Sequence, residues 1–313
     1  MAKQRIIVDA FGGDNAPAEI LKGCRMAADE LGVQIILTGS AEKIWAAAAQ
    51  NAVEIADFEI IDCPDVITME DEATDIMRAK KESSMAVGLR ALAEGRGDAF
   101  ASAGNSGAIV VGATLIVKRI KGVKRVAFAP LLPKSEGFFM LCDGGANNEC
   151  RPEMLAQFGL MGSVYMQKVM GLQNARVGLA NVGTEAHKGG ELQQAAHKLL
   201  AAQAGIRFVG NIEAKHIFSG RIADVVVCDG FVGNTIIKQV EGVYNMALEQ
   251  GLRNTYFNQL NYETVGGTPV LGINAPVLIG HGCSSAEAIK NMVLQTEKTI
   301  HAQLDTKLRE RFS

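Results

Sequence analysis

Six short loops in this sequence combine glycine with serine, asparagine or aspartate, and each lies between an apolar run and a helix-forming segment. In chain order they are DAFGGDNAP (Asp9–Pro17), SAGNSGA (Ser102–Ala108), CDGGANNE (Cys142–Glu149), NVGTEAHKGG (Asn181–Gly190), CDGFVGN (Cys228–Asn234) and GHGCSSAEA (Gly280–Ala288). Backbone N–H groups at a helix start favour an anion, and glycine lets the backbone approach a ligand closely. One such loop alone is more often an ordinary capped turn, but six in one chain favour a shared anion site.

These loops are not nucleotide-binding fingerprints. The sequence contains no G-x-x-x-x-G-K-[ST], and no apolar run is followed by G-x-G-x-x-G with an acidic residue at the distance of a ribose. The expected ligand is therefore a small oxyanion such as phosphate, or a substrate that carries phosphate.

The segments between the loops determine where the loops lie. Short β-branched runs without polar alternation alternate with helix-length segments, which predicts an α/β fold with a buried, mostly parallel sheet. In such a sheet the loops gather at the carboxyl ends of the strands, where ligands bind. The stretch RVAFAPLLPKSEGFFMLCDGG contains Pro133 and Gly137 between two apolar runs, and it predicts a hairpin that makes the sheet mixed. We see no linker and no repeat, and therefore expect a single αβα unit over residues 1–313, with two lobes sharing one sheet as the alternative.

Composition limits the classes of protein to consider. Hydrophobic residues make up 48% of the chain and the formal net charge is −3, which favours a globular core and gives no reason to expect nucleic-acid binding. The six cysteines are scattered without a C-x-x-C pair, which predicts free thiols in a reducing compartment. The N-terminal MAKQRIIVDA lacks the hydrophobic region of a signal peptide, so we expect a cytoplasmic protein.

Seven stretches together resemble one known family. They are VDAFGGDNAPAEILKG, KKESSMAVGLRAL, DAFASAGNSGA, GANNECRPE, NVGTEAHKGG, DVVVCDGFVGN and GGTPVLGINAPVLIGHG, which cover nearly the whole chain. This pattern is similar to that of the bacterial phosphate acyltransferases of phospholipid synthesis, the PlsX family. The sequence departs from the family pattern at five positions, which are Phe11, Ser106, Ala186, Gly190 and Cys283. At the position of Cys283 the family commonly has serine.

The resemblance implies a fold, an activity and partners. The implied fold is a three-layer αβα sandwich with one large mixed sheet, as in isocitrate dehydrogenase and phosphotransacetylase. The implied reaction forms acyl phosphate from a fatty acyl-[acyl carrier protein] and inorganic phosphate, without a cofactor or metal, and supplies the acylation of glycerol 3-phosphate. The implied assembly is a homodimer with peripheral membrane association and a membrane glycerol-3-phosphate acyltransferase as partner.

In this reaction phosphate attacks the thioester directly, so the protein must position it and stabilise charge. We expect the catalytic residues to be Lys81, Lys188 and His281, with Lys80 and His187 as the alternatives. A solvated lysine and a histidine bonded within its own turn are the competing interpretations. Cys283 is disfavoured as a nucleophile because the family has serine there.

The other expected site residues are small and polar. Those expected to bind phosphate or the pantetheine arm are Gly12, Gly13, Asp14, Asn15, Ser83, Ser84, Ser102, Gly104, Asn105, Ser106, Gly107, Asn147, Asn181, Gly183, Asp229, Gly230, Gly233 and Asn234. A metal site made from Asp9, Asp14, Asp143 and Asp229 is the alternative, but helix caps and loop-tying hydrogen bonds are preferred for these carboxylates.

Two segments are candidates for contacts with partners. KRIKGVKR carries five basic residues suited to an acidic carrier protein, with a solvated connection as the alternative; they are Lys118, Arg119, Lys121, Lys124 and Arg125. The second segment, MALEQGLRNTYFNQL, places Leu248, Leu252, Tyr256 and Leu260 on one helical face beside Phe257. The only cation of this segment is Arg253, and a single cation gives little attraction to anionic lipid. A dimer or core helix is therefore preferred, and at most weak contact with a membrane surface is expected.

Three other functions compete with acyl transfer from a carrier protein. The fold alone also suits a metal- and NAD-dependent decarboxylating dehydrogenase, which would need a nucleotide loop that the sequence lacks. Acyl transfer from coenzyme A is chemically closer. A scaffold that binds acyl phosphate without catalysis is the non-enzymatic alternative.

Overall fold

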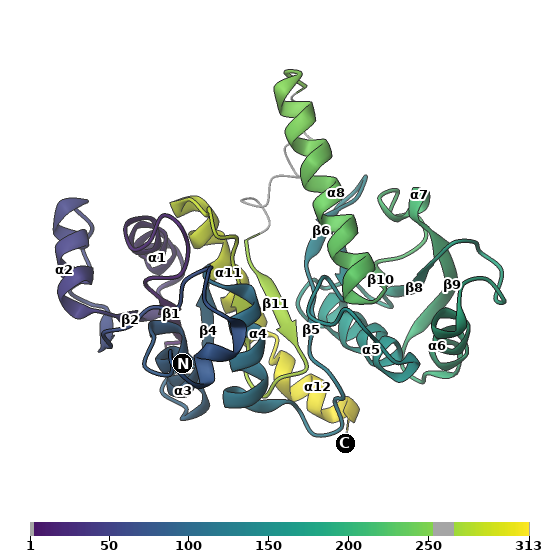
Figure 1. Ribbon diagram of the computed structural model, residues 1–313, viewed down its shortest axis with the longest axis horizontal. Helices are drawn as coiled ribbons and strands as arrows, with labels where there is room; N and C mark the ends of the chain where they lie inside the picture. The colour runs from purple at the N-terminus through teal and green to yellow at the C-terminus, as the bar shows by residue number, and fades with distance from the viewer. Residues whose placement is uncertain (1–2, 253–265, 313) are drawn as a thin grey trace. The chain divides into compact units, whose positions relative to one another are not determined.

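A computed structural model describes residues 3–252 and 266–312. The chain forms two compact units: Met1–Ile120 with Tyr262–Asp305, and Lys121–Asn261 with Thr306–Ser313. Each unit is an α/β structure with its own sheet (Figure 1). The short elements β5 (Ala127–Phe128) and α12 (Leu304–Phe312) complete the chain.

The sheet of the first unit is parallel except at one strand. Its strands have the order β3-β2-β1-β4-β12-β11, and β11 runs antiparallel to β12. Their bounds are β1 (Arg5–Asp9), β2 (Gln34–Gly39), β3 (Glu59–Asp62), β4 (Ala99–Ser102), β11 (Thr268–Leu271) and β12 (Val277–Ile279). Strands β1, β4 and β12 are adjacent and parallel, so the loops that follow them emerge at one edge of the sheet.

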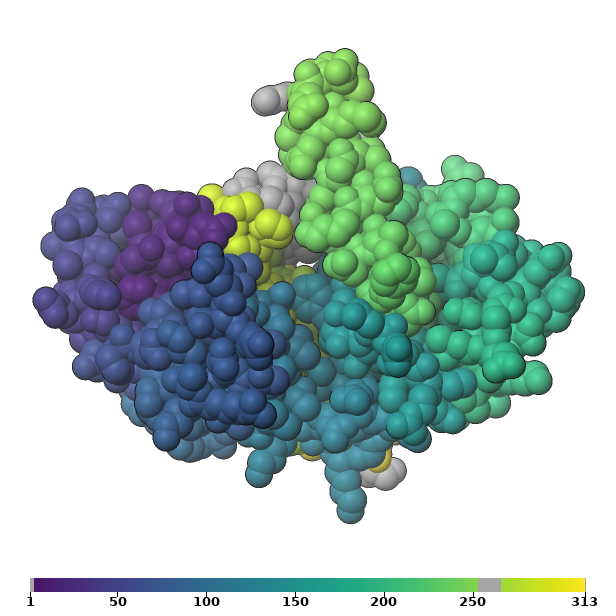
Figure 2. All heavy atoms as spheres, viewed as in Figure 1, coloured from purple at the N-terminus to yellow at the C-terminus, as the bar shows by residue number. Residues whose placement is uncertain are grey.

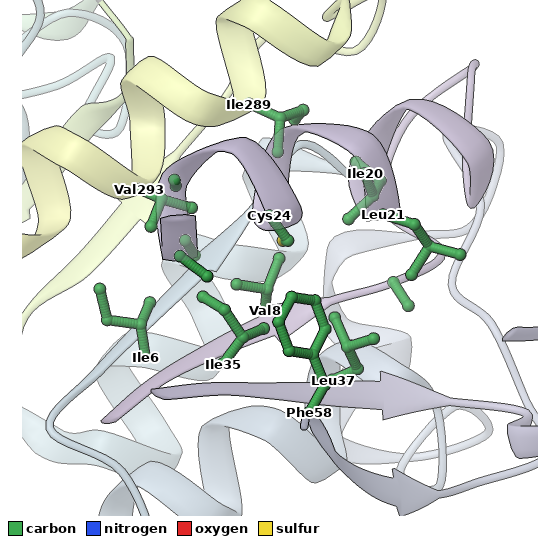
Figure 3. Packing of buried hydrophobic residues seen from close by; sticks show 14 of the residues in the cluster. Ile6, Val8, Ile20, Leu21, Cys24, Ile35, Leu37, Phe58, Ile289 and Val293 are labelled. Carbon is green, nitrogen blue, oxygen red and sulfur yellow. The ribbon is translucent and has the colours of Figure 1, made fainter. Parts of the chain in front are cut away.

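Helices cover both faces of this sheet. They are α1 (Ala18–Leu31), α2 (Ala41–Gln50), α3 (Ser84–Ala93), α4 (Ser106–Gly112) and α11 (Ala286–His301), with the 3₁₀ turn η1 (Ala73–Met77) and a π-helical continuation of α4, η2 (Ala113–Lys118). Figure 3 shows Val8 and Leu37 of the sheet facing Cys24 of α1 and Ile289 of α11. Ile7, on the opposite face of β1, is equally buried, and α3 packs against β1, β2 and β4. Burial on both faces explains why these strands lack polar alternation.

The second unit has a five-stranded sheet in the order β6-β7-β10-β8-β9. Its strands are β6 (Leu131–Pro133), β7 (Phe138–Cys142), β8 (Arg176–Asn181), β9 (Arg207–Glu213) and β10 (Val225–Val227). Its helices are α5 (Pro152–Lys168), α6 (Glu191–Ala202), α7 (Ala214–Ile217) and α8 (Gly230–Glu249). Strands β6 and β7 form the expected hairpin, in which Pro133 pairs with Phe138, and the other strand pairs are parallel.

Helix α8 is covered by few other side chains. Of its 20 residues only Gly230, Gly233 and Ala247 are buried, while Phe231 and Met246 are exposed. Figure 2 shows the second half of α8, in light green, as a column of side chains open to solvent. The expected amphipathic segment begins here; Leu252 is exposed, but Arg253, Tyr256, Phe257 and Leu260 lie outside the described residues. No described helix is long and apolar enough to cross a membrane.

The predicted α/β class with largely parallel sheets is confirmed, and the strands are divided between two sheets where one was expected. The apolar stretch from Val126 to Leu132 forms the two separate strands β5 and β6, with Pro130 between them. Strand β11 contains Pro269, which pairs with Leu278 of β12 although proline disfavours strand interiors.

Candidate functional site

Three loops of the first unit touch one another at the carboxyl ends of β1, β4 and β12. The N–H of Asp14 donates to the carbonyl of Gly282 at 2.8 Å, and the side chain of Asn15 donates to the carbonyls of Cys283 and Ser284 at 3.2 and 3.3 Å. The N–H of Gly280 also donates to the carbonyl of Ser102 at 2.8 Å, so the sequence-predicted loops at 9–17, 102–108 and 280–288 form one connected layer.

Asp9 and Ser102 lie beneath this layer and are buried. The Ser102 hydroxyl donates to Oδ2 of Asp9 at 2.8 Å and accepts the N–H of Gly104 at 3.1 Å. Oδ1 of Asp9 accepts the N–H of Phe11 at 3.1 Å. Burial raises the pKa of Asp9, and hydrogen bonds from Ser102 and Phe11 oppose that shift. The hydroxyl of Ser102 and the N–H of Gly104 thus form hydrogen bonds to other groups of the protein.

Asn105 also directs its side chain toward the protein. Its Oδ1 accepts the N–H of Ala108 at 3.0 Å as the N-cap of α4. Its amide group donates to the carbonyls of Thr68 and Asp71 at 3.1 and 3.2 Å. Ser106 and Gly107 are exposed, and their N–H groups lie in the first turn, where a helix offers no acceptor of its own.

In the KKESS segment (residues 80–84) the two serines are buried, and the two lysines differ in whether they form an ion pair. Ser83 caps α3 by accepting the N–H of Ala86 at 3.3 Å, and both Ser83 and Ser84 are buried. Lys80 pairs with Asp65 at 3.0 Å. Lys81 is exposed. The serines therefore organise α3, and Lys81 is the accessible cation of this segment.

His281 and Cys283 are exposed and touch each other. Nδ1 of His281 lies 3.0 Å from Sγ of Cys283, and the N–H of Cys283 donates to the same nitrogen at 3.4 Å. Because a backbone N–H can only donate, Nδ1 is the acceptor and the neutral ring carries its proton on Nε2.

In the second unit a buried aspartate organises the loop that follows β7. Oδ1 of Asp143 accepts the N–H of Phe128 at 2.9 Å, while Oδ2 accepts the N–H and the side-chain amide of Asn147 at 2.7 and 2.9 Å. Asn147 also donates to the carbonyl of Val126 at 2.8 Å. Burial raises the pKa of Asp143, against these hydrogen bonds. The Asn147 side chain therefore holds its own loop in place.

The loop after β10 packs directly on this aspartate loop. Asp229 caps α8 by accepting the N–H of Val232 at 2.9 Å, and the N–H of Gly230 donates to the carbonyl of Asn147 at 2.7 Å. A Cβ on Gly233 would lie 1.9 Å from the carbonyl oxygen of Asp143, so only glycine fits there. Asn234 is exposed.

Residues 182–190, here called the lysine loop, follow β8 and are held by side-chain amides. Asn181 donates to the carbonyl of Lys188 at 3.1 Å. Gln194 donates to the carbonyls of His187 and Gly189 at 2.9 and 3.0 Å. Asn211, on β9, donates to the carbonyl of Glu185 at 2.7 Å. Hydrogen bonds that converge on consecutive carbonyls give this loop one defined conformation.

Lys188 is half-buried, and the first part of its side chain lies along Gly183. The pKa of Glu185 is lowered, first by its own backbone N–H and then by the charges of Lys188 and His187. Within the part of the chain that the structure describes, Lys188 forms no ion pair. Unlike Lys80, it therefore keeps its charge available to a ligand.

The structure groups the sequence-predicted site residues by unit. Gly12 to Asn15, Lys81, Gly104 to Gly107 and His281 belong to the first unit, and Asn147, Lys188, Gly183 and Asp229 to Asn234 to the second. The five basic side chains of KRIKGVKR are exposed. Among residues 3–252 and 266–312, no group of three or more histidine, cysteine or acidic side chains could hold a metal ion. Asp9, Asp143 and Asp229 instead accept backbone N–H groups.

Sequence reasoning missed Asn211 and Gln194. Asn211 lies on a strand, outside every glycine-rich loop, and its signal is a Gly-Asn pair inside the apolar run FVGNIE. Such a pair within a strand marks a bulge, which can aim a side chain at a site.

The fold described above is similar to that of solved phosphotransacetylases. A phosphotransacetylase from Streptococcus pyogenes matches with a TM-score of 0.70 and 15% identity, covering 95% of this chain and 94% of that one. The EutD phosphotransacetylase from Staphylococcus aureus matches with a TM-score of 0.65 and 18% identity over the same shares. At these identities the likeness shows the fold alone.

Sequence comparison identifies the family. Residues 4–254 match the model of a family described as fatty acid synthesis protein. The phosphate acyltransferase of Clostridium acetobutylicum is 39% identical over 310 residues, 93% of each chain. That of Desulforamulus reducens is 40% identical over 324 residues, 98% of this chain and 96% of the other. The chain belongs to this family, which confirms the family expected from its motifs.

Proposed function

We propose that this protein transfers a fatty acyl group from the thioester of an acyl carrier protein to inorganic phosphate. The observation that carries the proposal is the similarity, near 40% identity over almost the whole chain, to relatives named phosphate acyltransferase. The arrangement of the loops supports it, because both units gather glycine-rich loops at the carboxyl ends of parallel strands.

The reaction makes few demands on side-chain chemistry. A phosphate oxygen attacks the thioester carbonyl carbon, the carbon–sulfur bond breaks, and the carrier thiolate leaves and takes up a proton. Phosphate is already a nucleophile at neutral pH, so the protein contributes positioning and stabilisation of the oxyanion. Loops fixed by internal hydrogen bonds suit that task.

Lys188 is assigned to phosphate and the developing oxyanion. Its loop is held by Asn181, Gln194 and Asn211, and it forms no ion pair with another described residue. Lys81 is the second cation, since it is exposed whereas Lys80 pairs with Asp65.

His281 is assigned to the leaving group. With Nδ1 accepting the N–H of Cys283, the neutral ring presents its Nε2–H. This group can stabilise the departing thiolate by a hydrogen bond while the thiolate takes its proton from solvent. Cys283 then serves to orient the ring, a role that serine can also fill.

The partners follow from charge and exposure. The exposed basic segment from Lys118 to Arg125 is assigned to the acidic carrier protein. The open apolar side chains of α8 are assigned to a second copy of this chain. Weak contact with a membrane surface, from the cytoplasm, would bring acyl phosphate to a glycerol-3-phosphate acyltransferase.

The test is a hydroxylamine trap with acyl carrier thioester and phosphate. We expect phosphate-dependent acyl hydroxamate and free carrier thiol in equal amounts; folded protein that forms neither would reject the proposed function. A parallel reaction with acyl-coenzyme A distinguishes the phosphotransacetylase-like alternative. Lys188→Ala should lose most of the turnover and Lys188→Arg should retain more, because the arginine keeps the charge.

The carrier-docking assignment has its own test. Reversing the charges of Lys118 and Lys121 to glutamate should raise the KM for the acyl carrier and leave the KM for phosphate unchanged. Equal KM values for the carrier in the variant and the wild type would contradict this assignment without touching the reaction itself.

A further inference from the structure

Asn211 connects the lysine loop to helix α6. The residue is 5% exposed, and its side chain makes one hydrogen bond through the amide nitrogen and one through the amide oxygen. The amide nitrogen donates to the carbonyl of Glu185 at 2.7 Å, and Oδ1 lies 3.0 Å from Nδ1 of His197. A buried amide satisfied on both sides holds two parts of the unit at a fixed distance.

A bulge in β9 places Asn211 in this position. Strand β8 pairs with β9 at Val177–Phe208 and next at Leu179–Asn211, so β9 contains one more residue than β8 between these pairs. Gly210, directly before Asn211, has a φ of +90°, which a side chain would strain. Bulges of this kind redirect the following side chain, here toward the lysine loop.

The hydrogen bonds also fix the proton on His197. Because the Asn211 nitrogen donates to a carbonyl, its Oδ1 must be the acceptor, and Nδ1 of His197 therefore carries a hydrogen. The ring is held against Phe208, edge to face, with centroids 5.0 Å apart.

We propose that Asn211 is a positioning residue for Lys188, oriented by His197 and acting through Glu185. The carbonyl of Glu185 accepts the Asn211 amide and also the backbone N–H of Lys188, at 3.0 Å. Moving this carbonyl moves the lysine with it. The group that fixes the loop is neutral, so it does not compete with phosphate for the lysine charge. This inference rests on the proposed function of Lys188.

Two variants remove the contact in different ways. Asn211→Ala removes both hydrogen bonds, whereas Asn211→Asp keeps the shape and the acceptor for His197 but cannot donate to Glu185. Either variant suffices if the other fails to fold. His197→Phe replaces the imidazole by another aromatic ring that can pack on Phe208. It removes both ring nitrogens and with them the Nδ1–H that bonds to Asn211. Ile212→Val, at the adjacent buried position of β9, is the matched control for a general loss of stability.

Two measurements read the result. The first is kcat and the KM for phosphate in the hydroxylamine assay. The second is the rate of tryptic cleavage at Lys188–Gly189 relative to Lys121–Gly122, which reports loop opening without any reaction. Misplacing a catalytic group by about 1 Å costs on the order of a hundredfold in rate, so we expect the Asn211 variants to lose roughly ten- to a hundredfold in kcat/KM.

We expect cleavage at Lys188 to rise several-fold in both Asn211 variants, less in His197→Phe, and not at all in Ile212→Val. Unchanged cleavage in folded Asn211 variants would overturn the positioning of the loop. Increased cleavage with unchanged kcat/KM would overturn its link to the reaction. Wild-type protein that forms no hydroxamate would reject the proposed function instead, and the cleavage arm would still test the loop.

Discussion

Asp224 provides the sharpest quantitative prediction, because it is a buried carboxylate between two cations. It precedes β10 in the second unit; its Oδ1 lies 2.7 Å from Nζ of Lys134, and its two oxygens accept two guanidinium N–H groups of Arg176, each at 2.9 Å. The side chains of Asp224 and Lys134 are only 7% and 10% exposed. Asp224→Asn removes the negative charge, so Lys134 and Arg176 lose the carboxylate with which they pair.

The expected cost follows from that burial. Breaking a buried ion pair by removing one partner costs about 3–5 kcal/mol, since the remaining charge stays desolvated. A typical domain has about 5–15 kcal/mol of stability, so Asp224→Asn should bring the second unit close to unfolding. The control is Glu59→Gln, whose pair with Arg96 is 42% and 47% exposed; it should cost at most about 1 kcal/mol.

The pKa of Asp224 gives the same prediction a dependence on pH. Burial alone would raise this pKa, but hydrogen bonds from Arg176 and Lys134 outweigh burial and hold it well below its usual range. A carboxyl with a lowered pKa in the folded state stabilises that state above its unfolded pKa, about 3.9, and the stabilisation is lost as pH falls further. Below pH 4 the difference in stability between wild type and Asp224→Asn should therefore narrow.

The assay is urea unfolding combined with hydrogen exchange of the β10 amides. These amides should exchange much faster in Asp224→Asn at pH 7. Below the unfolding temperature, kcat should stay near the wild-type value, because the pair with Arg176 lies at the end of β8 that is away from the lysine loop. A loss of less than about 1 kcal/mol at pH 7 would refute the assignment of the pair as a buried, desolvated one.

Three further predictions concern single side chains. Asn105→Ala removes the cap of α4 and two bonds to the 68–71 loop, and should cost about 2–4 kcal/mol in urea unfolding, with Asn105→Asp keeping the cap and losing less. Gly233→Ala should abolish activity and lower Tm, because its Cβ would clash with the carbonyl of Asp143; an unchanged Tm would contradict that geometry. Thr38→Val should leave the stability unchanged or raise it by up to about 1 kcal/mol in urea unfolding, because the buried Thr38 hydroxyl has no hydrogen-bond partner among the described residues.

The fold could be predicted from the sequence because its signals are local. Apolar runs such as RIIVDA contain no polar alternation, and the structure buries both faces of β1. The hairpin was predictable from Pro133 and Gly137, which interrupt an apolar stretch. The division into two units was not predictable in this way, since the boundary after Ile120 lies in KRIKGVKR, which has the composition of an ordinary solvated turn.

The candidate site was predictable as a set of loops but not atom by atom. Sequence shows that Ser102, Asn105, Asn147 and Asn181 are small, polar and close to glycine. It does not show whether their polar atoms face a ligand or the protein, because that depends on contacts between distant segments. Ser102 and Asp9 are hydrogen-bonded although they lie 93 positions apart in the sequence. Asn105 and Asp71 are also hydrogen-bonded, and they lie 34 positions apart.

The side-chain amides of these loops hold backbone carbonyls in place, and this arrangement suits a reaction in which phosphate is the nucleophile. An amide hydrogen that an asparagine donates to a carbonyl of its own loop is not available to a substrate, so each of these bonds exchanges a ligand contact for rigidity. That exchange favours catalysis when the substrate itself supplies the nucleophile, because the remaining demand is a cation held at a fixed position. Lys188 meets this demand better than Lys80, whose charge is paired with Asp65. The residues that matter most for turnover should then include the neutral amides around Lys188, which fix the backbone of its loop.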